Sequence, residues 1–400
     1  MEVKPGYKQT EVGVIPEEWE VIPLSKTAKR ITRGASPRPI DSPVWFDARS
    51  SVGWVRISDV TRSGRYLLET TQRLSDAGIR RSRPVPSGSL IMSICATVGR
   101  PIETRINTCI HDGFVVFDQP TIDQSFLYHT LTDLEPKWSK HGQTGSQMNL
   151  NTGLINRCLI HVPPLPEQRA IATVLSDVDG LLGGLDRLIA KKRDLKQAAM
   201  QQLLTGQTRL PGFHAEWEVK RLGTLLQFQV GFPFSSAFFN EKGEGIRLVK
   251  NRDLKSDDQV FHYNGMYEEA FVIRDGDVLI GMDGDFLPCQ WNKGPALLNQ
   301  RVGRVVPNTG LNVAFAFYAL IEPLKEIEIV TSCTTVKHLS HGDVEGIERP
   351  LPPLPEQTAI ASVLTEMDGE LAVLTQRREK TRTLKQAMMQ ELLTGKTRLI

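Results

Sequence analysis

The stretch Pro163-Pro-Leu-Pro-Glu-Gln168 occurs a second time as Pro352-Pro-Leu-Pro-Glu-Gln357, 189 positions further along the chain. The same offset aligns residues 162–210 with residues 351–399, and 30 of these 49 positions are identical without a gap. The composition of the segment is mixed, so low complexity does not explain the agreement. It indicates an internal duplication, around which the rest of the chain is organised.

The regions between the repeats resemble each other more weakly. The matched pairs are Glu18–Val21 with Glu216–Val219, Trp54–Val60 with Leu248–Leu254, and Gly88–Ile91 with Gly276–Leu279. The chain therefore reads as a globule (1–162), a repeat (163–210), a second globule (211–351) and a second repeat (352–400). Two globules with one frame and different content are typical of a scaffold with two specificities. A duplicated domain that has simply drifted is the alternative.

Each repeat has the apolar spacing of a long helix. In the first, the seam runs in steps of three and four, with an interruption at Lys192, through Ile171, Val174, Val178, Leu181, Leu185, Leu188, Leu195 and Ala199. Leu175, Leu182 and Ile189 lie beside this seam. The second copy keeps Ile360, Val363, Met367, Leu371, Leu374, Leu384 and Met388, and its middle, Arg377–Lys380, is polar.

The helix signals predict a start near Pro166 and Glu167 and an end at Gly206. About 40 residues at 1.5 Å each give a rod of about 60 Å, much longer than a typical globular helix. Pairing the two stripes in an antiparallel coiled coil, with the globules at opposite ends, buries both. The alternative is that each helix packs on its own globule.

The globules read as mixed α/β (α+β). Strands are expected at Ser89–Cys95, Gly113–Phe117, Asp277–Gly281 and Arg301–Val306, and a short helix at Leu311–Ile321. Loops rich in Gly and Pro join them at Gly34–Pro43 and Gly231–Ser236. The expected fold is two α/β globules joined by two long antiparallel helices, with pseudo-twofold duplication.

Composition places the chain among ordinary globular proteins, with 400 residues, 40% hydrophobic and 24% charged, and a net charge of +2. Five scattered cysteines without a CxxC pair suggest free thiols in a reducing compartment. Residues 1–10 do not resemble a signal peptide, and no run of about 18 apolar residues is present. We expect a cytoplasmic protein.

Catalytic and cofactor motifs are missing from the sequence. Gly395-Lys-Thr397 lacks the earlier glycine of a phosphate loop and closes a helix, and no GxGxxG, HExxH or GxSxG is present. The eight histidines form no metal-ligand pairs, and Asp283 and Asp285 fit a glycine turn better than a metal site. We expect no catalytic residue, no metal and no bound cofactor.

The first globule carries a local excess of positive charge. Residues 21–110 contain 15 Lys and Arg against 6 Asp and Glu. Arginine suits both DNA phosphates and guanine edges, although a solvated basic face is the plainer explanation. The DNA-binding candidates are Arg33, Arg38, Arg56, Arg62, Arg65, Arg81, Arg83 and Arg100, with polar readers Gln143, Thr144, Gln147 and Asn149.

The second globule is acidic, with 14 Lys and Arg against 19 Asp and Glu in residues 211–350. A DNA-binding surface there has to be a local cluster. The candidates are Arg247, Lys250, Asn251, Arg252, Asn299, Gln300, Arg301, Lys337 and His338, with Arg304 and Thr334 as further possibilities.

The PPLPEQ openings and the Leu-Leu-Thr-Gly ends of the repeats resemble the conserved regions of type I restriction–modification specificity subunits. The Glu-Trp-Glu-Val segments resemble the entry to each target-recognition domain of that family. The likeness covers the whole chain in the right order.

The resemblance implies several properties that periodicity does not. Each globule would read one half of a bipartite, asymmetric DNA site, and the helices would set the spacer. Two modification subunits would dock near the helices and bring S-adenosylmethionine for methylation of adenine N6, and two restriction subunits would add ATP- and Mg-dependent translocation and cleavage. The apolar helix positions given above would then serve the coiled coil and partner docking, and the chain itself would hold no cofactor and no metal.

Two other functions stay open from the residues alone. The first is a coiled-coil scaffold whose globules bind proteins. The second is a DNA methyltransferase or nuclease in its own right, which would need a cofactor motif that the sequence does not contain.

Overall fold

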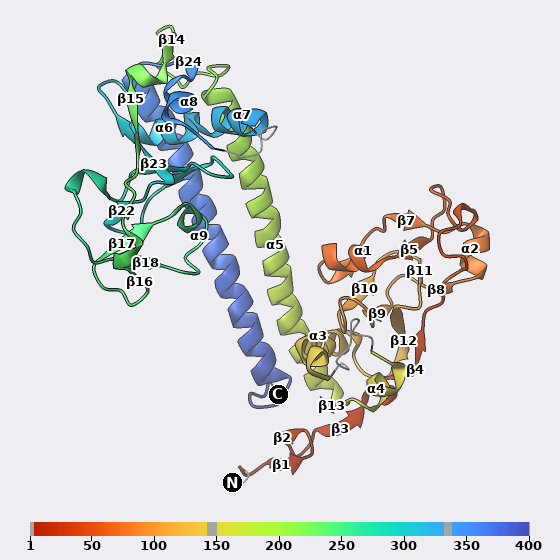
Figure 1. The fold of residues 1–400 in the computed structure, drawn as a ribbon. Coiled ribbons are helices and arrows are strands. Elements are labelled where there is room, and N and C mark those ends of the chain that lie inside the picture. Colours follow the sequence, from red (N-terminus) through yellow and green to blue (C-terminus); the bar gives the residue numbers. More distant parts are fainter. Residues whose placement is uncertain (1–3, 142–149, 332–337, 400) are drawn as a thin grey trace. The chain divides into compact units, whose positions relative to one another are not determined.

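The computed structural model describes residues 4–141, 150–331 and 338–399. The chain divides into two compact units: unit 1 comprises Met1–Leu188 with Thr375–Ile400, and unit 2 comprises Ile189–Leu374. The divisions fall inside the two long helices, so each unit contains one globule and a half of each helix (Figure 1).

The two repeats form the two long helices, α5 (Leu165–Leu203) and α9 (Leu354–Leu392), of 39 residues each. At 1.5 Å per residue each measures about 58 Å. α5 begins two residues before the expected Glu167 and ends three before Gly206. Gly206 has φ +72° and Gly395 has φ +71°, a left-handed conformation that suits glycine after a helix.

Ion pairs show that the helices run antiparallel within each unit. In unit 1, Asp179 of α5 pairs with Lys385 of α9 at 2.6 Å, and Asp186 pairs with Arg378 at 3.3 Å. As the residue number rises on one helix it falls on the other. In unit 2 the same order holds for Lys192 with Glu370 and Lys196 with Asp368, both at 2.5 Å. The Lys196–Asp368 pair is the duplicate of Asp179–Lys385.

Burial marks a regular seam on both helices. The least exposed positions recur in alternating steps of four and three, each buried or half-buried. On α5 they are Ile171, Leu175, Val178, Leu182, Leu185, Ile189, Lys192, Lys196, Ala199 and Leu203. On α9 they are Ile360, Leu364, Met367, Leu371, Leu374, Arg378, Thr381, Lys385, Met388 and Leu392. This is the heptad pattern of a coiled coil.

The phase of the expected seam was wrong at four leucines. Leu181, Leu188 and Leu195 of α5 are 44%, 40% and 48% exposed, and Leu384 of α9 is 57% exposed. Leu175, Leu182 and Ile189, expected beside the seam, occupy it instead. Val174 and Val363 are half-buried next to the seam positions.

Charged residues explain the error. Lys192, taken from the sequence as an interruption, is a seam residue whose charge meets Glu370. A long lysine side chain covers apolar surface with its methylene groups while its amine reaches a carboxylate at the edge. Arg378, from the polar middle of the second helix, does the same with Asp186.

A buried carboxylate lies at the start of each long helix. In unit 1, Glu167 is 2% exposed and accepts hydrogen bonds from Trp19 Nε1 at 2.9 Å and from Arg398 Nε at 2.6 Å and Nη2 at 2.9 Å. The glutamate of PPLPEQ therefore joins the entry segment of the globule to the tail that follows α9. We call this arrangement the unit 1 lock.

Unit 2 repeats the arrangement with equivalent residues. Glu356 is 1% exposed and accepts from Trp217 Nε1 at 3.1 Å and from Arg209 Nε at 2.5 Å and Nη2 at 2.6 Å. This unit 2 lock uses the tail that follows α5. The Glu-Trp-Glu-Val segments thus carry the tryptophan, and each Thr-Arg-Leu tail carries the arginine.

The glutamine of the motif fastens the globule to the same helix start. In unit 1, Gln168 accepts from the backbone N–H of Asp123 and donates to the carbonyl of Pro163, both at 2.8 Å. In unit 2, Gln357 accepts from the N–H of Asn312 and donates to the carbonyls of Pro352 and Gly310. Both glutamines are buried, so these amides satisfy backbone groups that water does not reach.

The globule of unit 1 is a pair of mixed sheets. The five-stranded sheet has the order β4-β12-β9-β10-β6, formed by β4 (Ala28–Arg33), β12 (Phe114–Pro120), β9 (Leu90–Ser93), β10 (Pro101–Thr104) and β6 (Tyr66–Leu67). The four-stranded sheet has the order β7-β5-β11-β8, formed by β7 (Gln72–Arg73), β5 (Gly53–Val55), β11 (Thr108–Ile110) and β8 (Arg83–Val85). Side chains from both sheets, including Ile91, Phe114, Val55 and Ile110, share one buried cluster.

Further strands and α-helices complete unit 1. They are β1 (Tyr7–Thr10) paired with β2 (Gly13–Pro16), β3 (Glu20–Pro23) paired with β13 (Leu159–Val162), and helices α1 (Ile57–Arg62), α2 (Asp76–Arg80), α3 (Gln124–His141) and α4 (Thr152–Arg157).

The globule of unit 2 repeats this plan. One sheet has the order β15-β23-β20-β21, formed by β15 (Leu226–Val230), β23 (Val302–Pro307), β20 (Val278–Gly281) and β21 (Pro288–Gln290). The other has the order β16-β18-β17-β22-β19, formed by β16 (Phe239–Asn240), β18 (Phe261–Tyr263), β17 (Ile246–Val249), β22 (Ala296–Leu298) and β19 (Val272–Ile273). The remaining elements are β14 (Glu218–Arg221) paired with β24 (Glu348–Leu351), α6 (Val313–Ala319), α7 (Ile321–Thr331) and α8 (His341–Glu345). The four strands expected from the sequence correspond to β9, β12, β20 and β23.

The joint between globule and helix has a tyrosine in unit 2 where unit 1 has a histidine. In unit 2, the Tyr318 hydroxyl donates to Asp368 at 2.7 Å. In unit 1 the equivalent residue is His129, whose Nδ1 lies 3.9 Å from Asp179 Oδ2. His129 Nδ1 and Asp179 Oδ2 are both buried and, within the described parts of the chain, have no hydrogen-bond partner. Burial, with smaller effects of Lys385 and Arg65, lowers the pKa of His129 to about 2, so the ring is neutral.

Candidate nucleic-acid interface

Equivalent loops gather at one end of the sheets in each unit. Gly34 follows β4 and Gly231 follows β15. Gly34 lies against the turn that precedes β12, and Gly231 lies against the turn that precedes β23. A Cβ atom at Gly34 would lie 2.1 Å from the carbonyl oxygen of His111, and one at Gly231 would lie 2.2 Å from that of Asn299. Glycine is therefore required at both positions for the close approach of two backbones. These loops bring distant polar residues together.

In unit 1 the loops surround a cavity of about 570 Å³. Its lining includes two of the predicted DNA-binding arginines, Arg33 and Arg56. Arg33 ends β4 and is exposed, and Arg56 is the N-cap of α1 and is half-buried. The other polar lining residues are Ser58, Cys95, His111 and Asp112. We call this the unit 1 loop pocket.

Hydrogen bonds fix the acidic side of the unit 1 loop pocket. Asp112 accepts from Ser36 Oγ at 2.6 Å, and its carbonyl accepts from Arg33 Nε at 2.6 Å. The Ser36 hydrogen bond, aided by His111 and Arg33, lowers the pKa of Asp112. Burial lowers the pKa of His111, whose Nδ1 accepts from the N–H of Gly113. The pocket thus presents a fixed carboxylate acceptor, a neutral imidazole and two guanidinium donors.

In unit 2 the equivalent loops form a polar cluster around Asp283. Its carboxylate accepts from Arg301 Nη1 at 3.4 Å and lies 3.0 Å from His338 Nδ1. Its carbonyl accepts from Asn251 Nδ2 at 2.6 Å. Asn299 and Gln300 belong to the adjoining turn, where the Asn299 side chain accepts from the Gln300 N–H. Five predicted DNA-binding residues therefore converge here, although they are spread over 88 positions of sequence.

Lys250 occupies the position that Arg56 has in unit 1. Each precedes a short helix and donates its N–H to an aspartate three residues later, Asp253 or Asp59. Lys250 Nζ lies 3.3 Å from the ring centroid of Phe261, and burial lowers the pKa of Lys250. The neighbouring Arg252 is exposed.

Two predicted DNA-binding residues have partners within the protein. Arg65 is 7% exposed, and its guanidinium pairs with Glu103 at 2.6 Å and donates to Ser125 and Ser176. It holds the globule to α5. Arg247 is 15% exposed, pairs with Asp257 and lies over the Trp291 ring. Arg65 is thus satisfied within unit 1, whereas Arg247 uses Nη2 for Asp257 and its buried Nε has no hydrogen-bond partner among the described residues.

Among the described residues, the other candidates neither line the unit 1 loop pocket nor belong to the polar cluster around Asp283. Arg38 and Arg81 are exposed, Arg62 pairs with Asp59, and Arg100 is half-buried and donates to the carbonyl of Ser63. Arg304, the weaker possibility, is held by Gln229 and Asp277. Arg83 lines a separate cavity described below. Gln143, Thr144, Gln147, Asn149, Thr334 and Lys337 lie outside the described residues.

Sequence reasoning overlooked Phe232. It follows Gly231, its N–H donates to the carbonyl of Leu298, and its own carbonyl accepts from the N–H of Gln300 at 3.1 Å. The ring is 42% exposed and contacts Phe234 and Phe271, with centroids 5.1 and 5.2 Å away. An exposed aromatic ring at the polar loop end offers an apolar surface to a base. The Gly-Phe-Pro-Phe run in a turn was the signal that could have revealed it.

Two further searches bear on the function. In the described parts of the chain, no three histidines, cysteines or carboxylates are grouped so as to hold a metal ion. No helix there is long and apolar enough to cross a membrane.

Comparison with known proteins decides the family. The model for the type I restriction modification DNA specificity domain matches twice, at residues 52–189 and 214–381. The chain belongs to this specificity family. The two matches also agree with the internal duplication, since one falls on each globule and its following helix.

Among its relatives, this specificity protein is 34% identical over 192 residues to the specificity subunit of the Escherichia coli type I restriction enzyme EcoBI. That match spans 47% of the chain and 40% of the E. coli protein. A putative type I restriction enzyme MjaX specificity subunit from Methanocaldococcus jannaschii is 25% identical over 427 aligned positions, covering 98% of the chain and 97% of the relative.

Solved structures support the fold. The S subunit of a type I restriction–modification system from M. genitalium matches with a TM-score of 0.65 at 13% identity, covering 98% of both chains. A chain from a structure of type I restriction–modification complex assembly matches with a TM-score of 0.57 at 20% identity, covering 96% of this chain and 99% of the other. The family membership means that this chain carries two copies of the type I restriction modification DNA specificity domain.

Proposed function

We propose that residues 1–162 and 211–351 are two target-recognition domains, each reading one half of a bipartite, asymmetric DNA site through the loop end described above. The observation that supports this is the convergence of equivalent loops in both units on different polar side chains. Arg33 and Arg56 in one, and Asn251, Gln300 and Arg301 in the other, carry the donors and acceptors that distinguish base edges in the major groove.

The segments 163–210 and 352–400 then act as the spacer. A helix of 39 residues is about 58 Å long, enough to cover more than one DNA turn of about 34 Å. Helix length would set the number of unread bases between the half-sites, whereas the loops would set their sequence. The gap and the half-sites are therefore separable properties of the chain.

The exposed leucines of α5 suit the modification subunits. Leu181 and Leu188 lie one heptad apart in unit 1 and are each at least 40% exposed, so they form an apolar stripe on the outer side of this part of the helix. Leu195, in unit 2, is 48% exposed at the next heptad. Leu384 of α9 adds to the exposed apolar surface of unit 1. Such a stripe suits a partner helix. We propose that two modification subunits, which hold S-adenosylmethionine, dock on these helices, and that two restriction subunits supply the ATP- and Mg-dependent steps, in the cytoplasm.

The decisive test maps methylated adenines in DNA by long-read sequencing after co-expression with the neighbouring modification subunit. The expected result is one bipartite motif with a fixed gap, which disappears when this chain is deleted. Arg301→Ala and Asn251→Ala should relax one half-site only, and Arg33→Ala and Arg56→Ala the other. The matched control is Arg274→Ala, an exposed residue of unit 2 that pairs with Glu269 and does not belong to the polar cluster around Asp283. A stable complex with no methylated motif would count against DNA recognition.

A further inference from the structure

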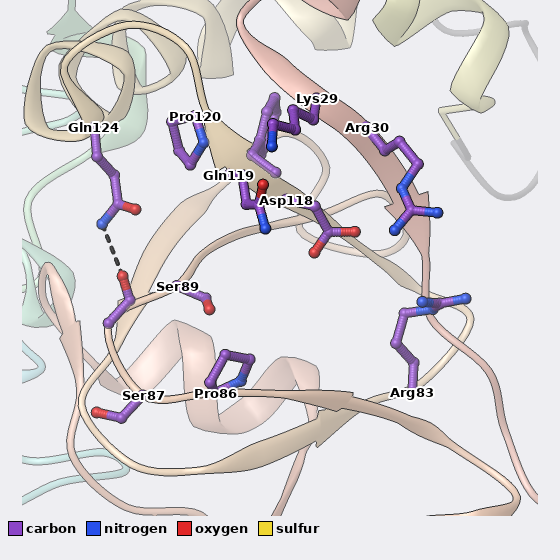
Figure 2. Close-up of a pocket in the computed structure, with 12 residues that line it drawn as sticks. Lys29, Arg30, Arg83, Pro86, Ser87, Ser89, Asp118, Gln119, Pro120 and Gln124 are labelled. Atoms are coloured by element: carbon purple, nitrogen blue, oxygen red, sulfur yellow. Dashed lines mark hydrogen bonds between the residues drawn. The ribbon is translucent and has the colours of Figure 1, made fainter.

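A second cavity of unit 1, of about 800 Å³, lies beside the strand that leads to the loop pocket. Two of its cations, Lys29 and Arg30, lie on β4, and the third, Arg83, lies on β8. The turn Pro86–Ser89 and the end of β12 complete the wall. Figure 2 shows the guanidinium groups of Arg30 and Arg83 pointing toward one another. We call this the basic cavity.

The basic cavity has more positive charge than its own acids balance. Among the described residues, Lys29, Arg30 and Arg83 form no ion pair. The one carboxylate of the lining is Asp118, whose Oδ2 already accepts from Thr32 Oγ1 at 2.8 Å. Arg83 Nε is buried and has no hydrogen-bond partner in the described chain. Two guanidinium groups that point toward one another repel unless an anion lies between them, so this arrangement suits an anionic ligand with several acceptor oxygens.

Two strands, β4 and β8, connect the basic cavity with the unit 1 loop pocket. Lys29 and Arg30 lie near the start of β4, and Arg33, which lines the loop pocket, ends the same strand. Three residues of strand span about 10 Å, which equals the rise of about three base pairs. Arg83 pairs in register with Ile110, directly before His111 of the loop pocket. A DNA strand whose bases meet the loop pocket thus has its backbone within reach of the basic cavity.

We propose that Arg30 and Arg83 bind a phosphodiester of the DNA backbone that flanks the half-site read by the first domain. This inference rests on the proposed function and adds an anchoring site to it. Phosphate contacts fix the register of a protein on DNA, whereas base contacts read the sequence. The basic cavity would therefore set affinity and its salt dependence and leave the half-site sequence unchanged.

Unit 2 provides an internal comparison, because Leu226 and Gln227 stand there at the positions of Lys29 and Arg30. They line a cavity whose other walls include Phe271 and, from α8, His341 and Glu345. Its carboxylate, Glu345, accepts from the N–H of Phe228. Strand pairing supports the alignment, since Arg30 is opposite Asp118 and Gln227 is opposite Val306. The two half-sites should consequently differ in their dependence on phosphate charge.

The test uses the complex with its modification subunits and a duplex that contains the mapped site. Affinity is measured from about 50 to 200 mM salt for wild type and for Arg30→Gln/Arg83→Gln. Each phosphate contact contributes about −0.9 to the slope of log K against log salt. The variant should therefore lower the slope by about 1 for one shared phosphate, with the methylated motif unchanged. Arg49→Gln/Lys137→Gln, which removes the same charge from exposed positions of unit 1, should leave the slope unchanged.

Single methylphosphonate substitutions, which remove one backbone charge, locate the contact. The expected result is a position beside one half-site where the substitution weakens wild type at least fivefold and leaves the double variant unaffected. An unchanged slope, or equal sensitivity of wild type and double variant at every position, overturns the inference while recognition persists. Loss of site-specific binding by wild type itself would overturn both this inference and the proposed function.

Discussion

The unit 1 lock makes a quantitative prediction. Arg398→Met removes two hydrogen bonds and the counter-charge from Glu167, which is 2% exposed and keeps one donor, Trp19. Leaving a buried charge without its partner typically costs about 3–5 kcal/mol. The Arg398 side chain is 28% exposed, so water replaces part of the lost interaction. We expect a loss of about 2–3 kcal/mol.

Differential scanning calorimetry measures this loss. For a domain of about 200 residues, 1 kcal/mol shifts the melting temperature by about 2–4 °C, so unit 1 should melt about 4–12 °C lower. The matched control Lys137→Met removes an exposed ion pair with Asp133 and should shift melting by no more than about 2 °C. Arg209→Met should lower the melting temperature of unit 2 in the same way.

The double variant Glu167→Met/Arg398→Met separates charge from packing. If the cost arises from the stranded carboxylate, replacing both groups by apolar side chains should recover most of the lost stability. A double variant as unstable as Arg398→Met, or an Arg398→Met shift no larger than that of the control, would refute the reasoning.

Three further predictions concern other parts of the molecule. Because the pKa of His129 is lowered to about 2 in the fold, the unfolded state binds one more proton than the folded state below about pH 6.5, and the free energy of unfolding of unit 1 should fall by up to about 1.4 kcal/mol for each pH unit below that value. His129→Tyr should flatten this pH dependence, because the tyrosine gives Asp179 a hydroxyl donor. Urea titrations that show the same fall in unfolding free energy for wild type and His129→Tyr would contradict this prediction. If Phe232 contacts a thymine methyl group, replacing thymine by deoxyuracil at one position of a half-site should weaken wild type about fivefold and Phe232→Ala hardly at all. Deleting one heptad from each helix of unit 1, residues 181–187 and 377–383, should shorten the preferred gap by about three base pairs and leave both half-sites unchanged in methylation mapping.

The sequence predicted the architecture because duplication and helix periodicity can both be read from the order of residues without knowledge of the fold. The same signals misplaced the phase of the seam. Leucines were counted as seam residues and lysines as interruptions, yet Lys192 and Lys196 lie in the seam and Leu188 and Leu195 outside it. Lys192 and Lys196 are favourable in the seam because Glu370 and Asp368 of the opposite helix pair with them. The sequence of one helix does not show which residues of the other helix will lie opposite it.

The candidate site was predicted only in part, for a related reason. Arg33 and Arg56 were expected to bind DNA and do lie together, whereas Arg65 belongs to the same basic region and is buried against Glu103. Charge counts do not distinguish an arginine that faces solvent from one that ties a domain to a helix. Phe232 was not expected, because an aromatic residue in a turn more often belongs to the core.

The reciprocal use of the tails bears on how such a chain originates. The first repeat supplies both Glu167, which accepts the second tail, and Arg209, which completes the second lock. A gene encoding only residues 1–210 would hold the tryptophan, the glutamate and the arginine of one complete lock. Two such half-length products could exchange tails and satisfy both locks, each copy reading the same bases. Duplication of one such half-length segment therefore supplies every residue of both locks, because each repeat carries the glutamate of one lock and the arginine of the other.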